Sequence, residues 1–173
     1  MNLTVIILTA NERLHIARCL ERLAPLAPVQ VFVIDCFSTD GTQALAQQSF
    51  ASGPWGLGAS VPPPVVSIVE HAWPGTQAKQ FNWALDNCPI RTKWVLRLDA
   101  DEYLMPEAIA ELKGLLPTLP EDVTGIELPL IRVWRGHVMR HGVGKIILTR
   151  LFRFGKGRCE ERMMDEHIRL NEG

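Results

Sequence analysis

Four apolar segments alternate with helical segments over the first hundred residues, and this alternation constrains the fold more than any other feature. The segment Leu3–Thr9 is a continuous apolar run rich in β-branched residues, which is typical of a parallel strand covered on both faces. Between such segments, apolar residues recur at helical spacing, as they do at Ile16, Leu20 and Leu23. The predicted strands cover residues 3–9, 30–35, 65–70 and 93–98, and the predicted helices cover residues 16–23, 44–46 and 77–87.

The β-α-β-α-β-α-β order predicts an α/β fold with a mostly parallel central sheet and flanking helices. In such folds, ligands gather beyond the carboxyl ends of the strands. After a predicted helix over residues 106–116, the pattern changes to two strands over residues 125–134 and 146–154. The 173 residues are 47% hydrophobic, so the chain is long enough for one domain with a real core. We expect a single domain over residues 1–173, with one part over 1–116 and a second part over 117–173.

The sharpest local feature is Asp99-Ala100-Asp101, which follows the apolar strand predicted over residues 93–98. In extended backbone, residues i and i+2 point the same way and stand about 7 Å apart. Two carboxylates placed in this way can flank one Mg2+ or Mn2+ ion, whose remaining positions are filled by water and substrate phosphates. The structural alternative is a turn after a strand, with solvated or capping aspartates.

Polar residues also end the first two predicted strands. Thr9, Asn11 and Glu12 lie at the end of the first strand and can line one ligand pocket together with Asp99 and Asp101. Asp35 ends the second strand, where a carboxylate can accept a hydrogen bond from the N3–H group of a pyrimidine base. Lys79 lies early in a predicted helix and can reach a phosphate, although an ordinary exposed lysine is an equal alternative.

The acidic run over residues 159–167 can supply a group that takes a proton from an acceptor hydroxyl. We predict Asp165 as this base and Glu166 as the second candidate. His167 can complete a metal site. The alternative is an acidic surface with a structural histidine.

Positive charge is concentrated between Leu128 and Cys159, a stretch with eight Lys or Arg residues and no Asp or Glu. This pattern suits a solvated face, or a surface for the phosphates of an acceptor or of anionic lipid headgroups. Nucleic acid is not expected as a partner, because the stretch lacks interleaved aromatic residues in an RNA-binding pattern. No window approaches the about 20 consecutive apolar residues that a membrane-spanning helix needs. We expect a cytoplasmic protein that can contact the inner face of the membrane peripherally.

Five segments together resemble the family 2 glycosyltransferases, which have the Rossmann-like GT-A fold and invert the anomeric centre of the donor sugar. They occur in the order of that family, span nearly the whole chain, and read VIILTANERLHIARCL, VFVIDCFSTDGT, QAKQFNWALDN, VLRLDADEYL and RLFRFGKGRCEERMMDEH. Within that family, the chain looks closest to bacterial enzymes that build lipopolysaccharide core or other surface glycans.

The resemblance implies a role for each candidate residue. Asp35 would contact the base of a nucleoside-diphosphate sugar, with a UDP-sugar favoured, and Asp99 and Asp101 would serve a divalent cation and the diphosphate. Asp165 would be the base in a transfer to a glycan or phosphorylated glycolipid. Residues 1–116 would then bind the nucleotide sugar and residues 117–173 would form the acceptor side. Relatives continue beyond the predicted base, so we expect the acceptor part to be truncated.

Two other functions fit parts of the same pattern. A nucleotide-sugar-binding module, or an inactive fragment, would bind the donor without transferring the sugar. A sugar nucleotidyltransferase also combines an α/β sheet with acidic metal ligands, but such enzymes usually carry a glycine-rich, basic loop after the first strand. The sequence Leu8-Thr9-Ala10-Asn11-Glu12 provides no such loop.

Overall fold

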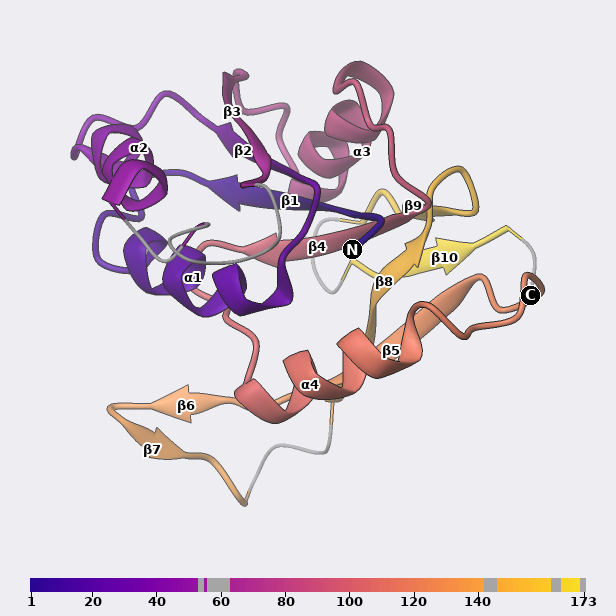
Figure 1. The fold of residues 1–173 in the computed structure, drawn as a ribbon. Coiled ribbons are helices and arrows are strands. Elements are labelled where there is room, and N and C mark those ends of the chain that lie inside the picture. The colour runs from indigo at the N-terminus through magenta and orange to yellow at the C-terminus, as the bar shows by residue number, and fades with distance from the viewer. Residues whose placement is uncertain (53–54, 56–62, 142–145, 163–165, 172–173) are drawn as a thin grey trace.

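The computed structural model of the chain describes residues 1–52, 55, 63–141, 146–162 and 166–171. Its centre is a six-stranded sheet with the order β3-β2-β1-β4-β8-β5 (Figure 1). The strands span Leu3–Thr9 (β1), Gln30–Asp35 (β2), Val65–Glu70 (β3), Trp94–Asp99 (β4), Gly125–Leu130 (β5) and Ile146–Arg153 (β8). Strands β1 to β4 pair in parallel, whereas β8 pairs with β4 and β5 in antiparallel. The predicted α/β class with a mostly parallel sheet is confirmed.

Helices cover both faces of this sheet (Figure 1). They span Ile16–Leu23 (α1), Thr42–Ser52 (α2), Gln77–Asn87 (α3) and Pro106–Leu115 (α4), with a 3-10 turn over Ala24–Leu26 after α1. Along β1, Val5 and Ile7 pack into a core with side chains of α1 and α4, and Ile6 and Leu8 pack into a second core with side chains of α3. This two-sided burial explains why β1 reads as a continuous apolar run. No helix in the described part of the chain is long and apolar enough to cross a bilayer.

The register of the parallel strands brings their carboxyl ends to one edge of the sheet. Thr9 at the end of β1 pairs with Asp35 at the end of β2. Leu8 on β1 pairs with Asp99 at the end of β4. The fold therefore places Thr9, Asp35 and Asp99 along the same edge, as the strand order predicts.

Helix α2 is longer than the short helix predicted around residues 44–46. It begins at Thr42 and runs to Ser52, although its sequence lacks a clear apolar stripe. The side chain of Asp40 explains the early start, because its Oδ1 accepts hydrogen bonds from the amide (3.0 Å) and the hydroxyl (2.5 Å) of Thr42. A carboxylate in this position satisfies amide groups that have no partner inside the helix.

The single strand predicted over residues 125–134 is wrong in its second half. Strand β5 ends at Leu130, and the chain then forms a separate hairpin of β6 (Val133–Trp134) and β7 (His137–Val138). The turn uses Arg135 and Gly136, both at positive φ (49° and 80°), as a two-residue type I′ hairpin turn requires. The apolar residues of this segment pair with each other instead of extending the sheet.

Two short strands that were not predicted close the second core. Strands β9 (Gly157–Cys159) and β10 (Ile168–Leu170) pair in antiparallel. Phe152 on β8 is fully buried beneath α3, where its ring lies edge-on to Phe81 with 6.2 Å between the ring centroids. A Cβ atom at Gly157 would come within 2.7 Å of the Phe152 ring, so this glycine permits close approach of β9.

We expect Phe152→Ala to lower the free energy of unfolding by about 3–5 kcal/mol, because a fully buried aromatic ring would be replaced by a cavity. The matched control is Phe154→Ala, two residues along the chain, where the ring is 42% exposed. The control should cost about 1 kcal/mol or less. Urea unfolding followed by circular dichroism measures both values. Equal losses for the two variants would contradict the packing described for β8.

Candidate active site

Predicted site residues meet at the carboxyl edge of the parallel strands. Thr9, Asp35 and Asp99 are the last residues of β1, β2 and β4. The hydroxyl oxygen of Thr9 is buried and has no hydrogen-bond partner among the described residues. Buried polar atoms without a partner are uncommon in native proteins. Thr9 therefore offers an unused hydrogen-bonding group at this edge.

The loops that follow β1 and β2 are joined to each other by hydrogen bonds. The amide of Asn11 donates to the hydroxyl of Ser38 (2.8 Å), and its side-chain oxygen accepts from the amide of Thr39 (2.9 Å). The amide of Arg13 donates to Asp40 (3.1 Å). Asn11 adopts a left-handed conformation with φ of 56°, which asparagine tolerates better than most residues. These contacts fix the shape of the edge where a ligand would enter.

Asp35 is fully buried, and its carboxylate is already occupied by neighbouring side chains. It accepts hydrogen bonds from the amide (2.8 Å) and hydroxyl (2.5 Å) of Ser38 and from the side-chain amide of Gln43 (2.7 Å). The Gln43 amide also donates to Glu70 at the end of β3 (2.8 Å). In this arrangement Asp35 organises the loop after β2. Its contact with a nucleotide base stays a prediction.

Glu12 and Lys79 lie at the starts of the helices that follow β1 and β3. The carboxylate of Glu12 is 2.7 Å from Nδ1 of His15. Helix α3 is capped by Thr76, whose hydroxyl accepts from the amide of Lys79 (3.2 Å). The side chain of Lys79 is exposed, and its ammonium group has no described partner. Contact of Lys79 with a phosphate stays a prediction.

The backbone around Asp99 and Asp101 differs from the extended geometry expected from the sequence. Strand β4 ends at Asp99, and Ala100 and Asp101 form a turn. The Asp99 carboxylate lies 3.4 Å from Arg97 and 3.7 Å from Arg150. The Asp101 side chain is exposed, and its carboxylate forms no ion pair with the residues that the structure describes. The turn thus separates a paired carboxylate from an open one.

These two carboxylates fit a magnesium or manganese site in which the ligand supplies most of the donors. In the described part of the chain, no group of three or more His, Cys, Asp or Glu side chains is arranged to hold a metal ion. Mg2+ usually takes only one or two carboxylates and fills its other positions with water and substrate phosphates. Asp101 is exposed and Asp99 is partly exposed, so both are candidates for this smaller set, and their binding of a cation stays a prediction.

The site also contains three charged residues that the sequence reasoning missed. Arg97 on β4 is 2% exposed and donates to the side-chain oxygen of Gln77 at the start of α3 (2.8 Å). Arg150 on β8 forms an ion pair with Glu102. Burial raises the pKa of the Glu102 carboxyl, and the guanidinium of Arg150 opposes this shift. Arg97 could have been predicted as a site residue, because a charge inside a buried apolar strand needs a partner.

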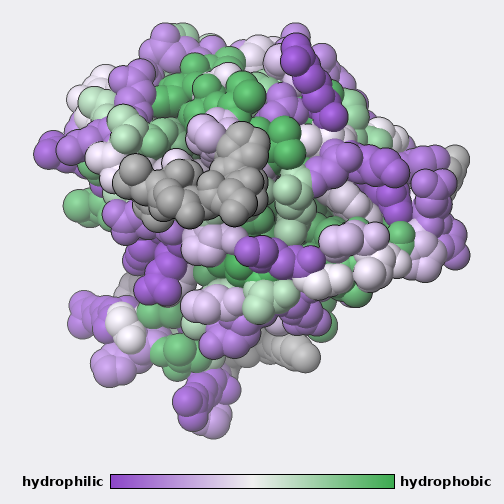
Figure 2. All heavy atoms as spheres, viewed as in Figure 1, coloured by the Kyte–Doolittle hydropathy of each residue, from purple (hydrophilic) through white to green (hydrophobic). Residues whose placement is uncertain are grey.

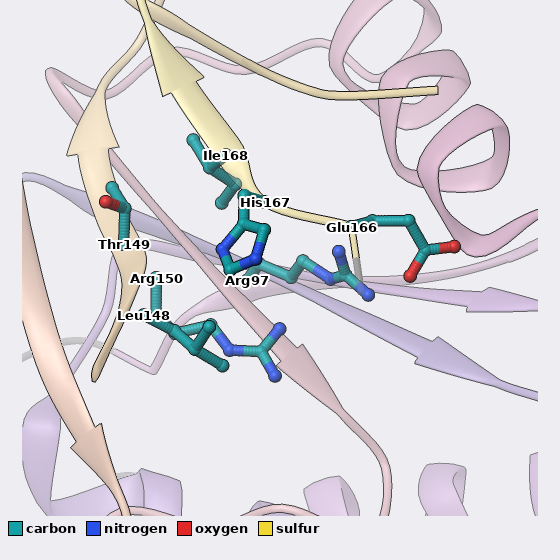
Figure 3. Close-up of a pocket in the computed structure, with 7 residues that line it drawn as sticks. All are labelled: Arg97, Leu148, Thr149, Arg150, Glu166, His167 and Ile168. Carbon is teal, nitrogen blue, oxygen red and sulfur yellow. The ribbon is translucent and has the colours of Figure 1, made fainter. Parts of the chain in front are cut away.

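A small pocket joins these arginines to the C-terminal segment (Figure 3). Its lining consists of Arg97, Leu148, Thr149, Arg150, Glu166, His167 and Ile168. Glu166 and His167, both predicted from the sequence, thus line the same pocket as Arg97 and Arg150. Asp165, the predicted base, lies outside the described residues. The role of His167 as a metal ligand stays a prediction.

The basic stretch divides into residues that are paired with other parts of the chain and residues that are exposed on one hairpin. Arg150 is engaged at the site, Arg153 donates to the main-chain oxygens of residues 120 and 123, and Arg158 forms a two-point contact with Asp86. The arginines in positions 132, 135 and 140 are exposed on and beside the β6–β7 hairpin. Three of the eight basic residues are therefore paired within the chain, and three others gather on one projecting element.

The chain is similar to known proteins over most of its length. The model of glycosyl transferase family 2 matches residues 4–162. The chain is 30% identical over 163 residues to the lipopolysaccharide core biosynthesis glycosyltransferase LpsC of Rhizobium meliloti (strain 1021), a match that covers 91% of this chain and 53% of LpsC. The chain therefore spans about half the length of that relative.

Two solved structures show the same fold. The mannosyltransferase PcManGT from Pyrobaculum calidifontis, in complex with GDP-Man and Mn2+, superposes with a TM-score of 0.56 and 26% identity over 72% of this chain and 34% of its own. Glucosyl-3-phosphoglycerate synthase from M. tuberculosis has a TM-score of 0.50 and 19% identity over 70% of this chain and 42% of its own. The expected GT-A fold is confirmed, and the chain belongs to glycosyl transferase family 2.

Proposed function

We propose that this chain carries the donor site of a metal-dependent, inverting glycosyltransferase that acts in the synthesis of bacterial surface glycans. The observation that carries the proposal is the open carboxylate of Asp101 beside Asp99, at the edge where β1, β2 and β4 end. The family membership and the similarity to LpsC support the surface-glycan assignment. The similar mannosyltransferase was solved with GDP-Man and Mn2+, which supports a nucleotide sugar and a divalent cation as ligands.

In this mechanism the residues of the carboxyl edge hold the donor. Asp101 and Asp99 would hold a Mg2+ or Mn2+ ion, which supplies positive charge for the diphosphate leaving group. Thr9, Asn11, Glu12 and Asp35 border the nucleotide, and Lys79 is exposed for contact with a phosphate.

The acceptor is bound on the side formed by residues 117–173. Asp165 takes the proton from the attacking hydroxyl, with Glu166 as the second candidate, and the hydroxyl adds to the anomeric carbon opposite the leaving diphosphate. One displacement of this kind inverts the anomeric centre and needs no covalent sugar–enzyme intermediate. Glu166 lines a pocket with Arg97 and Arg150, which supports a place for this acidic segment near the carboxyl edge. A glycan or phosphorylated glycolipid is the proposed acceptor.

A transfer assay tests the function directly. The purified chain is incubated with radiolabelled UDP-glucose, UDP-galactose or GDP-mannose and with bacterial lipopolysaccharide, in manganese or in EDTA. We expect label transfer or nucleotide release from one donor, and loss of that activity in EDTA. Binding of the donors without transfer or hydrolysis would instead identify a nucleotide-sugar-binding module.

A further inference from the structure

The β6–β7 hairpin projects from the body of the molecule (Figure 1) and every residue from position 131 to 141 is exposed. In Figure 2 it forms a separate lobe in which hydrophilic and hydrophobic residues are mixed. Isolated two-stranded hairpins are marginally stable in water. This exposed hairpin therefore gains little stability from the described part of the chain, and a surface outside the chain could supply contacts.

The hairpin combines large apolar side chains with positive charge. Its exposed apolar residues are Ile131, Val133, Trp134, Val138 and Met139, and Trp134 is the most exposed of them at 67%. Three arginines and two histidines accompany them, with no acidic residue between positions 131 and 141. None of these three arginine side chains forms a hydrogen bond or an ion pair with a residue that the structure describes. This composition complements a surface that is both apolar and negatively charged.

Both faces of the hairpin carry exposed apolar residues. Val133 pairs with Val138 on one face and Trp134 pairs with His137 on the other. The amide of Met139 donates to the main-chain oxygen of Arg132 (2.9 Å), which continues the pairing toward the body. A protein partner would favour a hairpin with its apolar residues on one flat face. In a bilayer, by contrast, the preferred position of a side chain depends on its depth. Indole rings lie at the headgroup level, and arginine side chains extend along apolar surface to reach phosphates.

The residue at the first position of the hairpin turn is unusual for its backbone conformation. Arg135 adopts φ of 49° at the first position of the hairpin turn. This conformation favours asparagine, aspartate or glycine, so the backbone does not explain the arginine. The Arg135 side chain is exposed at the tip of the hairpin.

The topology connects this element to the active site. The hairpin leaves the sheet between the end of β5 and the start of β8, where Leu130 pairs with Ile146. Because β8 is antiparallel to β4, with Leu96 opposite Leu151, the start of β8 lies at the same edge as Asp99. A surface that binds the hairpin therefore faces the edge at which the donor is proposed to bind.

We propose that the β6–β7 hairpin docks the protein on an anionic lipid bilayer, with Trp134 at the headgroup level and the neighbouring arginines on lipid phosphates. The docking itself stands on the hairpin alone. Only its consequence, the delivery of the donor site to a lipid-linked acceptor, rests on the proposed function. Docking from this edge would bring the two substrates together at the bilayer surface.

Vesicle co-sedimentation tests the proposal with the full chain. The vesicles contain phosphatidylcholine alone, or phosphatidylcholine with phosphatidylglycerol. We expect binding to the anionic vesicles that weakens with added salt, and about 30-fold weaker binding for the double variant Arg132→Gln/Arg140→Gln, from the usual contribution of two basic residues near an anionic surface. Trp134→Ala should also weaken the binding.

Matched controls remove the same charge and a similar ring elsewhere. Arg91→Gln/Lys93→Gln changes two exposed basic residues before β4, at the opposite edge of the sheet, and Phe154→Ala removes an exposed ring. Both should bind vesicles as the wild type does. Wild-type binding that is absent or equal on neutral and anionic vesicles would overturn the proposal, as would an equal loss in the controls. Hairpin-dependent dimerisation without vesicle binding would identify a self-association surface instead.

The outcome for the hairpin is separable from the outcome for the proposed function. Nucleotide release from the donor in solution is measured on the same hairpin variants and should not change. Vesicle binding without any donor turnover in the wild type would leave the docking in place and remove the proposed function. Donor turnover without vesicle binding would leave the proposed function in place and overturn the docking proposal.

Discussion

Asp101→Asn is expected to lower the rate of sugar transfer by about 10³-fold or more. The substitution keeps the size of the side chain but removes the negative charge from the one open carboxylate of the Asp99–Asp101 turn. Electrostatic stabilisation of the developing charge is usually the largest single contribution in a transfer of this kind. The measurement is the initial rate of nucleotide release at saturating donor and manganese.

The matched control for Asp101→Asn is Asp122→Asn, an exposed aspartate in the segment before β5. It should leave the rate unchanged, because Asp122 lies outside the carboxyl edge. If Asp101→Asn retained most of the wild-type rate, the assignment of this residue to the diphosphate site would be wrong. A comparable loss in Asp122→Asn would point to a general effect of the lost charge.

Asp165→Asn is expected to lower kcat by about 10²–10⁴-fold, the usual contribution of a positioned proton acceptor. Donor binding should persist, because the substitution leaves Asp99 and Asp101 in place. A fall in kcat with little change in KM for the donor separates a role in proton transfer from a role in binding. The assay is the same nucleotide release, measured with acceptor present.

Two neighbours of Asp165 in the sequence serve as comparisons. Glu166→Gln alters a residue of the pocket that contains Arg97 and Arg150, and Glu161→Gln alters an exposed residue of the same acidic run. The Glu161 variant should transfer sugar normally. If Asp165→Asn were fully active and Glu166→Gln inactive, the base would be Glu166, and the assignment of Asp165 would be withdrawn.

The strands of the first half could be predicted because burial on two faces leaves a simple signal. Strands β1, β2 and β4 are buried along nearly their whole length, so each reads as an uninterrupted apolar run. The parallel order then follows from the helices between them. The position of Thr9, Asp35 and Asp99 at one edge is a consequence of topology and needs no knowledge of side-chain packing.

The second half was harder to predict because its elements depend on contacts between distant residues. Strand β9 has three residues, and its pairing with β10 joins segments that carry little propensity of their own. The break after Leu130 depends on the β6–β7 hairpin pairing with itself. Helix α2 begins where Asp40 accepts hydrogen bonds from Thr42, a contact that apolar periodicity does not reveal.

The charged contacts of the site show a similar limit. The spacing of Asp99 and Asp101 predicted two carboxylates that point the same way. That geometry requires the strand to continue in extended conformation beyond Asp99. The strand ends there, and the antiparallel β8 brings Arg150 to the first carboxylate from about fifty positions away. Local sequence spacing does not reveal contacts between residues on strands that are far apart in the chain.

Metal-dependent nucleotide binding at Asp99 and Asp101 is the central claim, and thermal unfolding tests it most directly. The wild type and Asp101→Ala are each heated with UDP, GDP or ADP, with and without manganese. At about 100 times its dissociation constant, a ligand stabilises the folded state by about 2.7 kcal/mol, or about 5–10 °C in Tm for a domain of this size. We expect such a rise for one nucleotide, only with manganese and only in the wild type. An equal rise in Asp101→Ala, or no rise with any nucleotide in a wild-type chain that unfolds cooperatively, would contradict the claim.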